Sequence, residues 1–241
     1  MSEAAQSTLR IYCDFDGTIV ADDVGDAFFE RFSGPEMWED SAKFRAGEFG
    51  MRALFDRYLA RMGALTPARC DAFADGFAPL DDFPAFVAWA HEAGHPLLIL
   101  SDGLDMYIRR ILMNAGLELE FRANALKFGA EGAPAIALPY RDEACERCGT
   151  CKRNQMLVRS ADNDVIVYIG DGISDFCAAA HADIVFAKGE LETYCREQNI
   201  SFRRWRVFDD VRRDLVSLVQ HRVLRRPRRA VLNRQAVWSS G

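Results

Sequence analysis

The sequence predicts an α/β protein built on a doubly wound, Rossmann-like parallel sheet. Strand-like apolar segments alternate with helix-like segments along most of the 241 residues, which is the pattern of βαβ units. Two of these segments, 96–100 and 165–169, are continuously apolar, as expected for strands buried on both faces. Polar signatures follow the predicted strands at 14–18, 101–103 and 170–175. Ligands of such sheets bind at the edge where the carboxyl ends of the strands lie.

The predicted elements follow a regular order. Residues 9–13 form the first strand. Residues 19–80 contain helices and no convincing strand, because Phe28 and Phe32, among others, recur at helical spacing and Thr66 caps a segment that begins with Pro67. After residue 80, further strands are expected at 96–100, within 121–139, at 164–169 and at 184–187. Helices are expected at 83–93, 104–115, 152–159, 176–180, 190–197 and 209–219.

The chain is expected to divide into a core, a cap and a tail. The core takes residues 1–20 and 81–220, the helical cap takes 21–80, and a basic tail takes 221–241. The length suits one domain with a smaller insert. Because the insert leaves the sheet directly after the first polar signature, it is placed to cover the ligand-binding edge. The tail is expected to be extended and solvated.

Composition and charge exclude several classes of protein. The net charge is −6, although residues 201–241 hold eleven arginines against three aspartates. The remaining acidic body disfavours nucleic-acid binding and suits a protein that holds a divalent cation. No apolar run approaches the ~20 residues of a membrane span, and no apolar signal segment precedes the first strand. Seven cysteines without a disulfide framework predict a reducing, cytoplasmic location without membrane contact.

Four carboxylates carry the chemistry of the predicted strand ends. Asp14 and Asp16 follow the first strand, and Asp171 and Asp175 follow the strand at 164–169. Like charges this close repel unless a cation lies between them or one is protonated. Oxygen ligands without a nearby histidine suit Mg²⁺. The competing interpretation is a turn cap for the first pair, and a helix N-cap with a first-turn acid for the second.

Two further residues could bind a phosphate. Ser101 follows a predicted strand and precedes a predicted helix, so its hydroxyl and the amides after it, eased by Gly103, can face an anion. Taken alone, this position is typical of an N-cap serine. Lys152 opens a helix and could supply a point charge, although its local sequence alone indicates a surface lysine.

These residues resemble the four motifs of the haloacid dehalogenase superfamily. The motifs are Asp14-Phe15-Asp16-Gly17-Thr18, Ser101, Lys152 and Gly170–Asp175, in the family's order. The second aspartate resembles the phosphatase branch. The insert resembles the C1-type cap of the phosphoserine phosphatase-like group, and the Cys-x-x-Cys-x-x-Cys-Lys stretch at 145–152 is similar to the MtnX-like group and its phosphocholine/phosphoethanolamine phosphatase relatives.

The resemblance implies a role for each motif residue. Asp14 would be the nucleophile that forms an aspartyl-phosphate. Asp16 would be the general acid and base. The expected Mg²⁺ ligands are Asp14, the main-chain carbonyl of Asp16, and Asp171, with Asp175 as a further ligand or a support. The phosphate would be bound by Ser101, Lys152 and the amides of Gly17 and Gly103.

The expected function is therefore a Mg²⁺-dependent phosphatase that acts on a small phosphorylated metabolite. The substrates left open are 2-hydroxy-3-keto-5-methylthiopentenyl-1-phosphate, phosphoserine, and phosphocholine or phosphoethanolamine. Phosphotransfer to an acceptor other than water is the alternative within enzymes. A non-catalytic binding or regulatory module and a polyanion-binding protein that uses the arginine-rich tail are alternatives from other classes. The oligomeric state is not predicted.

Two weaker signals remain. Cys145, Cys148 and Cys151 could hold Zn²⁺, but a structural zinc site needs a fourth ligand, so thiols packed in a loop are favoured. A few charged residues early in the cap could select the substrate, for example through a cationic head group, although solvated helix faces are favoured for each. These specificity candidates are Asp22, Asp23, Arg45, Glu48 and Arg52.

Overall fold

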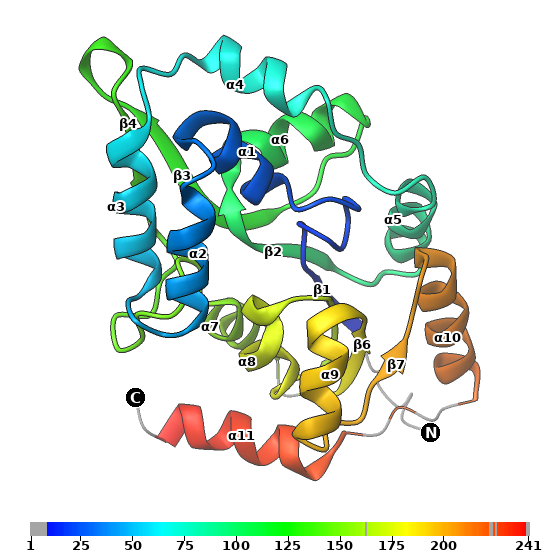
Figure 1. Cartoon of the computed structure of the whole chain (residues 1–241). Coiled ribbons are helices and arrows are strands. Elements are labelled where there is room, and N and C mark those ends of the chain that lie inside the picture. Colours follow the sequence, from blue (N-terminus) through cyan, green and yellow to red (C-terminus); the bar gives the residue numbers. More distant parts are fainter. Residues whose placement is uncertain (1–8, 162, 222–223, 225, 240–241) are drawn as a thin grey trace. The chain divides into compact units, whose positions relative to one another are not determined.

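The computed structural model describes residues 9–161, 163–221, 224 and 226–239 (Figure 1). The described chain falls into two compact units. The first unit takes the chain up to Asp14, then Leu80–Ile99, and then the chain from Lys152 onward. The second unit takes Phe15–Pro79 and Leu100–Cys151. The strand β2 (Leu97–Leu104) runs through both.

The first unit is built on parallel strands in the order β2-β1-β5-β6-β7. In the central pair Ile11 of β1 lies opposite Val167 of β5, and every residue of β5 is buried, because both faces of the sheet are covered. This confirms the parallel α/β sheet that the apolar runs predict. The other strands of this unit are β1 (Leu9–Cys13), β5 (Val165–Gly170), β6 (Ile184–Ala187) and β7 (Arg203–Arg204).

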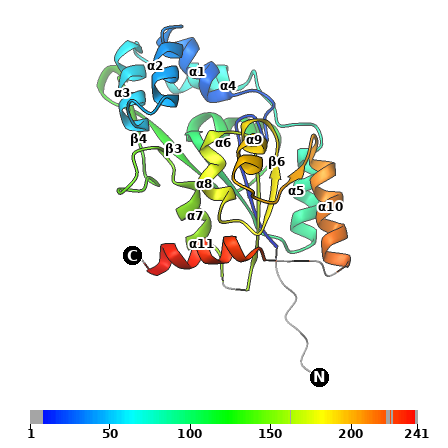
Figure 2. The same ribbon diagram turned by 60° about the horizontal axis from the view of Figure 1, so that its bottom comes forward.

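Helices cover both faces of these strands, as Figure 2 shows for α5 and α10 on one side and α7 and α8 on the other. Phe208 of α10 packs against Phe83 and Phe86 of α5 with ring centroids 4.8 and 5.1 Å apart. The helices of the unit are α5 (Phe83–Glu92), α7 (Lys152–Val158), α8 (Phe176–Ala179) after a 3-10 turn (Ile173–Asp175), α9 (Gly189–Glu197), α10 (Phe208–Gln220) and α11 (Arg228–Ser239).

The second unit combines helices with an antiparallel strand pair next to β2, in the order β4-β3-β2. Leu126 of β3 lies opposite Ile136 of β4, and both strands lie within 121–139, where short strands are expected. The elements are α1 (Val24–Ser33), α2 (Met37–Arg45), α3 (Met51–Arg61), α4 (Pro67–Ala74), α6 (Asp105–Asn114), β3 (Phe121–Phe128), a 3-10 turn (Ala130–Gly132) and β4 (Pro134–Ala137).

The aromatic residues of α1, α3 and α4 form a core of their own. Phe28 is fully buried, and its ring centroid lies 5.5 Å from that of Phe29 and 5.4 Å from that of Phe73. The ring centroid of Phe29 in turn lies 4.6 Å from that of Tyr58, with the two rings tilted by 39°. The helical spacing of these residues thus reflects packing of the three helices against one another.

The expectation of an extended, solvated tail is wrong for the described part of it. Residues 228–239 form α11, and Ala230 and Arg234, one turn apart, are buried. Nη2 of Arg234 lies 3.0 Å from Asp183, and Asn233 donates to the carbonyl of Ala180 at 2.8 Å. Polar groups thus anchor this helix. An apolar stripe, which is the usual sequence signal of a packed helix, is therefore absent here. Two tail arginines, Arg222 and Arg225, lie outside the described residues.

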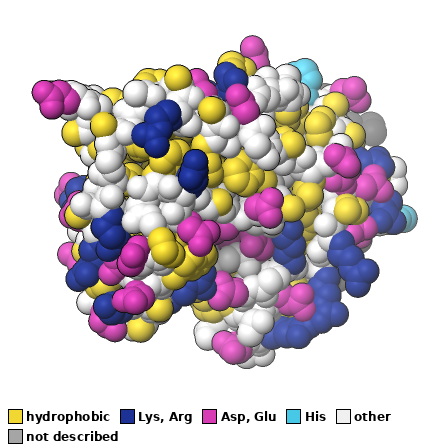
Figure 3. All heavy atoms as spheres, turned by 45° about the horizontal axis from the view of Figure 1, so that its top comes forward, with side chains coloured by type: hydrophobic (Ala, Val, Ile, Leu, Met, Phe, Trp, Pro, Cys, Tyr) yellow, Lys and Arg dark blue, Asp and Glu magenta, His cyan; other side chains and the backbone are white. Residues whose placement is uncertain are grey.

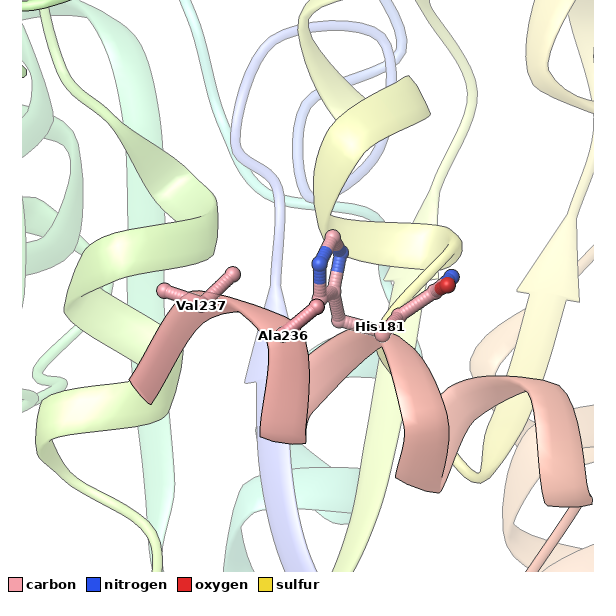
Figure 4. Close-up of a pocket in the computed structure, with 4 residues that line it drawn as sticks. His181, Ala236 and Val237 are labelled. Carbon is pink, nitrogen blue, oxygen red and sulfur yellow. The ribbon is translucent and has the colours of Figure 1, made fainter. Parts of the chain in front are cut away.

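An open pocket of about 340 Å³ lies between α11 and the turn after α8. His181, Ala236 and Val237 line it together with Asn233 (Figure 4). Because His181 precedes β6, the pocket lies at the amino end of that strand, whereas ligands of such sheets bind at the carboxyl ends. None of the helices in the described ranges has the length and apolarity to cross a membrane.

Candidate active site

Three aspartates gather at the carboxyl ends of β1 and β5 in the first unit. Asp14 follows β1 directly, Asp171 follows β5, and Asp175 ends the short turn after it. The Asp14 amide donates to the carbonyl of Ile169 at 2.9 Å, which fixes the main chain where the strands end. One carboxylate oxygen of each aspartate lies within 4.8 Å of the others. Three hard oxygen ligands at this spacing suit a divalent cation such as Mg²⁺.

Lys152 holds this group together. It begins α7 and is only 2% exposed. Its Nζ lies 2.6 Å from Oδ1 of Asp14 and 2.7 Å from Oδ1 of Asp175, and it donates to Oγ of Ser174 at 2.8 Å. Burial alone would lower the pKa of Lys152, but the two carboxylates outweigh it and raise that pKa above its ordinary value. The ammonium therefore stays charged.

Asp175 is engaged through both of its oxygens. Oδ1 accepts hydrogen bonds from Nζ of Lys152 at 2.7 Å and Oη of Tyr168 at 2.6 Å. Oδ2 accepts from the amides of Asp171 and Gly172 at 2.9 and 3.0 Å. Burial would raise the pKa of Asp175, but Lys152 and these hydrogen bonds hold it below its usual range. The carboxylate thus orients both the lysine and the main chain at Asp171.

The group carries more negative than positive charge. Burial, and then repulsion from Asp175, raise the pKa of Asp14 well above its ordinary value, which Lys152 offsets only in part. Lys188 follows β6 at the same edge, and its pKa is lowered by burial while Asp171 opposes that change. A cation held by Asp14 and Asp171 would relieve the repulsion among the carboxylates. The donor set therefore fits a divalent ion.

A second polar group surrounds Asp16 in the second unit. Oδ1 of Asp16 accepts hydrogen bonds from the amides of Val24 and Gly25 at 3.0 and 3.3 Å, at the start of α1. Oδ2 accepts from Oγ of Ser101 at 3.2 Å and from Oη of Tyr107 at 2.9 Å. A carboxylate at a helix N-terminus is stabilised by the helix dipole. The carboxyl group of Asp16 is thus held by two amides and two hydroxyls.

Ser101 lies within β2 and not at its end, because the strand continues to Leu104 and α6 begins at Asp105. The competing interpretation of Ser101 as an N-cap is therefore wrong. Its Oγ accepts a hydrogen bond from the amide of Gly103 at 2.9 Å. Gly17 adopts a φ of +68°, which favours glycine, and its amide donates to the carbonyl of Asp22 at 3.1 Å.

A family model described as haloacid dehalogenase-like hydrolase matches residues 11–180. The chain belongs to this family. The resemblance of the four motifs is thereby confirmed.

Relatives of this hydrolase carry phosphatase names. One from Exiguobacterium sibiricum, named 2-hydroxy-3-keto-5-methylthiopentenyl-1-phosphate phosphatase, is 30% identical over 85% of this chain and 94% of its own. One of the same name from Bacillus mycoides is 28% identical over 88% of this chain and 98% of its own. A solved structure described as a phospho-aspartyl intermediate analogue of phosphoserine phosphatase has a TM-score of 0.59 at 18% identity, covering 78% of this chain and 91% of its own. That likeness shows a shared fold.

The specificity candidates of the hydrolase all have exposed side chains, namely Asp22, Asp23, Arg45, Glu48 and Arg52. Oδ1 of Asp23 accepts a hydrogen bond from the amide of Asp26 at 2.7 Å and so caps α1. Asp26, which the sequence does not single out, is half-buried. Burial, and then the charge of Asp23, raise the pKa of Asp26 to about 6, against the opposing effect of Arg45.

The cysteine loop of the hydrolase is held by its main chain. Oδ1 of Asp102 accepts hydrogen bonds from the amides of Gly149 and Thr150 at 2.9 and 2.8 Å, and the main-chain oxygen of Asp102 accepts one from Asn124 at 2.6 Å. Glu146 accepts one from the amide of Met51. Over the described ranges, Cys145, Cys148 and Cys151 form no group with converging ligand atoms, unlike the aspartates.

Sequence reasoning missed two residues beside these groups. Tyr107 lies at apolar helical spacing in α6 and therefore resembles an ordinary core residue. Lys188 follows a strand at its carboxyl end, so the rule that selects Asp14 and Asp171 could also have selected it. Several of the described arginines of the first unit form ion pairs, for example Arg203 with Asp214 at 3.0 Å. Figure 3 shows basic and acidic side chains next to one another on the face drawn there.

Proposed function

We propose that this hydrolase is a Mg²⁺-dependent phosphatase that cleaves a small phosphorylated metabolite through an aspartyl-phosphate on Asp14. The observation that carries the proposal is the group of charged side chains in the first unit. There Lys152 contacts Asp14, and one carboxylate oxygen of Asp171 lies within 4.8 Å of an oxygen of Asp14, close enough for both to bind one cation. Membership of the family and the phosphatase names of the relatives support it.

In the first step, an oxygen of Asp14 attacks phosphorus and the bond to the leaving oxygen breaks. The leaving oxygen takes the proton of the Asp16 carboxyl group. In the second step, Asp16 takes a proton from water as the water attacks phosphorus, which releases inorganic phosphate and restores Asp14. Both steps require that Asp16 be held while its proton moves, and the hydrogen bonds that its carboxyl group accepts contribute to that restraint.

Charge neutralisation is the second requirement of phosphoryl transfer. Lys152 supplies one fixed positive charge beside the nucleophile. Asp14 and Asp171, with the carbonyl of Asp16, are the proposed holders of Mg²⁺, and Asp175 supports them because its oxygens are already engaged. When bound, Mg²⁺ would supply Lewis-acid stabilisation of the phosphoryl charge.

The substrate we favour is 2-hydroxy-3-keto-5-methylthiopentenyl-1-phosphate. A relative named as the phosphatase of this compound is 30% identical to this chain, and the match covers 94% of the relative's length. Phosphoserine and phosphocholine or phosphoethanolamine are the other candidates. We place the specificity determinants in residues 21–80 and the reaction in the cytoplasm, as the sequence predicts.

The test is phosphate release from these esters and from 4-nitrophenyl phosphate, in Mg²⁺ and in EDTA. We expect turnover in Mg²⁺ and loss of turnover in EDTA. Asp14→Asn, which keeps the shape but removes the nucleophilic charge, should lose at least about a thousandfold in kcat. The matched control is Asp81→Asn, an exposed aspartate of the same unit, which should keep full activity.

Two outcomes would contradict the proposal. Normal turnover by Asp14→Asn would exclude the aspartyl-phosphate. Absence of phosphate release from every ester by the wild-type protein, in the presence of Mg²⁺, would exclude the phosphatase activity and favour a binding module.

A further inference from the structure

Tyr107 makes a hydrogen bond whose purpose the fold alone does not explain. Its side chain is fully buried in α6, yet its hydroxyl donates to Oδ2 of Asp16 at 2.9 Å, across 91 positions of sequence. A phenylalanine would fill the same apolar space without burying a hydroxyl. The main chain of Leu104 also contacts this hydroxyl, but Asp16 is the charged group to which it donates.

Two glycines leave the space that this hydroxyl occupies. A Cβ built on Gly103 would lie 1.6 Å from Oη of Tyr107, and one on Gly25 would lie 3.2 Å from it. The tyrosine ring also packs against Phe15, with centroids 6.1 Å apart. A side chain at 103 would thus overlap the hydroxyl and one at 25 would crowd it, so packing limits the positions that the hydroxyl can take beside Asp16.

The hydroxyl of Ser101, which also contacts Oδ2 of Asp16, has a second proposed role. Oγ of Ser101 lies 3.2 Å from Oδ2 of Asp16, but Ser101 is also the proposed phosphate ligand. When its hydroxyl turns to a phosphoryl oxygen, Oδ2 keeps Tyr107 as its side-chain donor among the contacts described. The amides of Val24 and Gly25 hold only Oδ1.

We infer that Tyr107 is a positioning residue that holds the Asp16 carboxyl group for its proton transfers. The inference rests on the proposed function, because it assigns Tyr107 a part in that reaction. In the first step the P–O bond breaks and the proton passes from Asp16 to the leaving oxygen. Without the tyrosine hydroxyl, the carboxyl group rotates more freely and fewer encounters place its proton on that oxygen.

The consequence depends on the leaving group. Nitrophenolate is a weak base and departs with little need of a proton, whereas phenolate is more basic and needs one. We expect Tyr107→Phe to lower kcat/KM about tenfold for phenyl phosphate, a fraction of the effect of a general acid, and less than about twofold for 4-nitrophenyl phosphate. A merely structural role would lower both by the same factor.

The matched control is Tyr58→Phe. Tyr58 is a buried tyrosine of the same unit whose hydroxyl lies 2.6 Å from Oγ of Ser41. Its loss should leave the ratio of the two kcat/KM values unchanged. Hydrogen exchange of the Val24 and Gly25 amides, measured by NMR on the full chain, gives a second readout. Both amides donate to Asp16, so they should exchange faster in Tyr107→Phe and not in Tyr58→Phe.

An unchanged ratio of kcat/KM values in Tyr107→Phe, or unchanged exchange at Val24 and Gly25, would overturn the inference. Wild-type protein that is inactive on both esters would overturn the proposed function. The exchange of the two amides would then still decide whether Tyr107 positions Asp16.

Discussion

Replacing Arg234 by alanine should destabilise the first unit through the loss of one buried ion pair. The side chains of Arg234 and Asp183 are 8% and 0% exposed, with Nη2 and Oδ1 3.0 Å apart. Nη1 of the arginine also donates to the carbonyl of His181 at 2.7 Å. The substitution would leave the Asp183 charge buried without its counter-charge.

The size of the effect follows from what remains around Asp183. Removing one partner of a buried pair costs about 3–5 kcal/mol. Oδ2 of Asp183 keeps its hydrogen bond from the amide of Ile166, at 2.9 Å, so we expect the lower end, about 3 kcal/mol. For a chain of this size each kcal/mol lowers the melting temperature by about 2–4 °C, which gives roughly 6–12 °C.

The assay is thermal unfolding followed by circular dichroism, with Arg228→Ala as control. Arg228 lies on the same helix and is exposed, so its loss should change stability by less than about 0.5 kcal/mol. Adding Asp183→Asn to Arg234→Ala removes the uncompensated charge and should recover part of the loss. If Arg234→Ala melts within about 2 °C of the control, the pair does not anchor α11 and the reasoning is wrong.

Two further predictions concern the second unit. Asp26→Asn should raise the melting temperature at pH 8 and leave it unchanged at pH 4. The folded-state pKa of Asp26 is about 6, above its ordinary value, so the folded protein loses stability as pH rises from about 4 to 6. Asp102→Ala removes the acceptor of the Gly149 and Thr150 amides, and should therefore speed tryptic cleavage at the exposed Arg147 severalfold, measured by mass spectrometry.

Each of these has its own contradicting outcome. If Asp26→Asn changes the melting temperature by the same amount at both pH values, ionisation of Asp26 does not destabilise the folded protein. For the cysteine loop, the control is Asp142→Ala, which removes the acceptor of the nearby Ala144 amide and leaves the contacts of Asp102 in place. Equal cleavage rates in the two alanine variants would show that Asp102 does not hold the loop.

The strand ends were the most predictable part of the site. Asp14 and Asp171 follow runs of buried apolar residues, so the general rule for parallel sheets places them at one edge. Lys152 was less predictable, because its burial depends on Asp14 and Asp175, which are distant in sequence. The family resemblance, and not the local pattern, selected it.

The residues that escaped prediction share a physical cause. Tyr107 shows the apolar spacing of a core helix, and only its partner, Asp16, distinguishes it from phenylalanine. The helix α11 is held by polar contacts of Arg234 with Asp183 and the His181 carbonyl, and of Asn233 with the Ala180 carbonyl, and these leave no apolar repeat in the sequence. A pattern method detects repeated apolar burial, whereas these features depend on a few polar contacts between residues that are distant in sequence.

The close fit between Gly103 and Tyr107 also constrains how the sequence can drift. A Cβ at position 103 would lie 2.7 Å from Oδ2 of Asp16 as well as 1.6 Å from the tyrosine hydroxyl. A side chain at 103 would therefore require the Tyr107 hydroxyl or the Asp16 carboxylate to move. The constraint acts in one direction: position 107 can change while Gly103 stays, whereas a larger residue at 103 should be accepted only together with a change at 107.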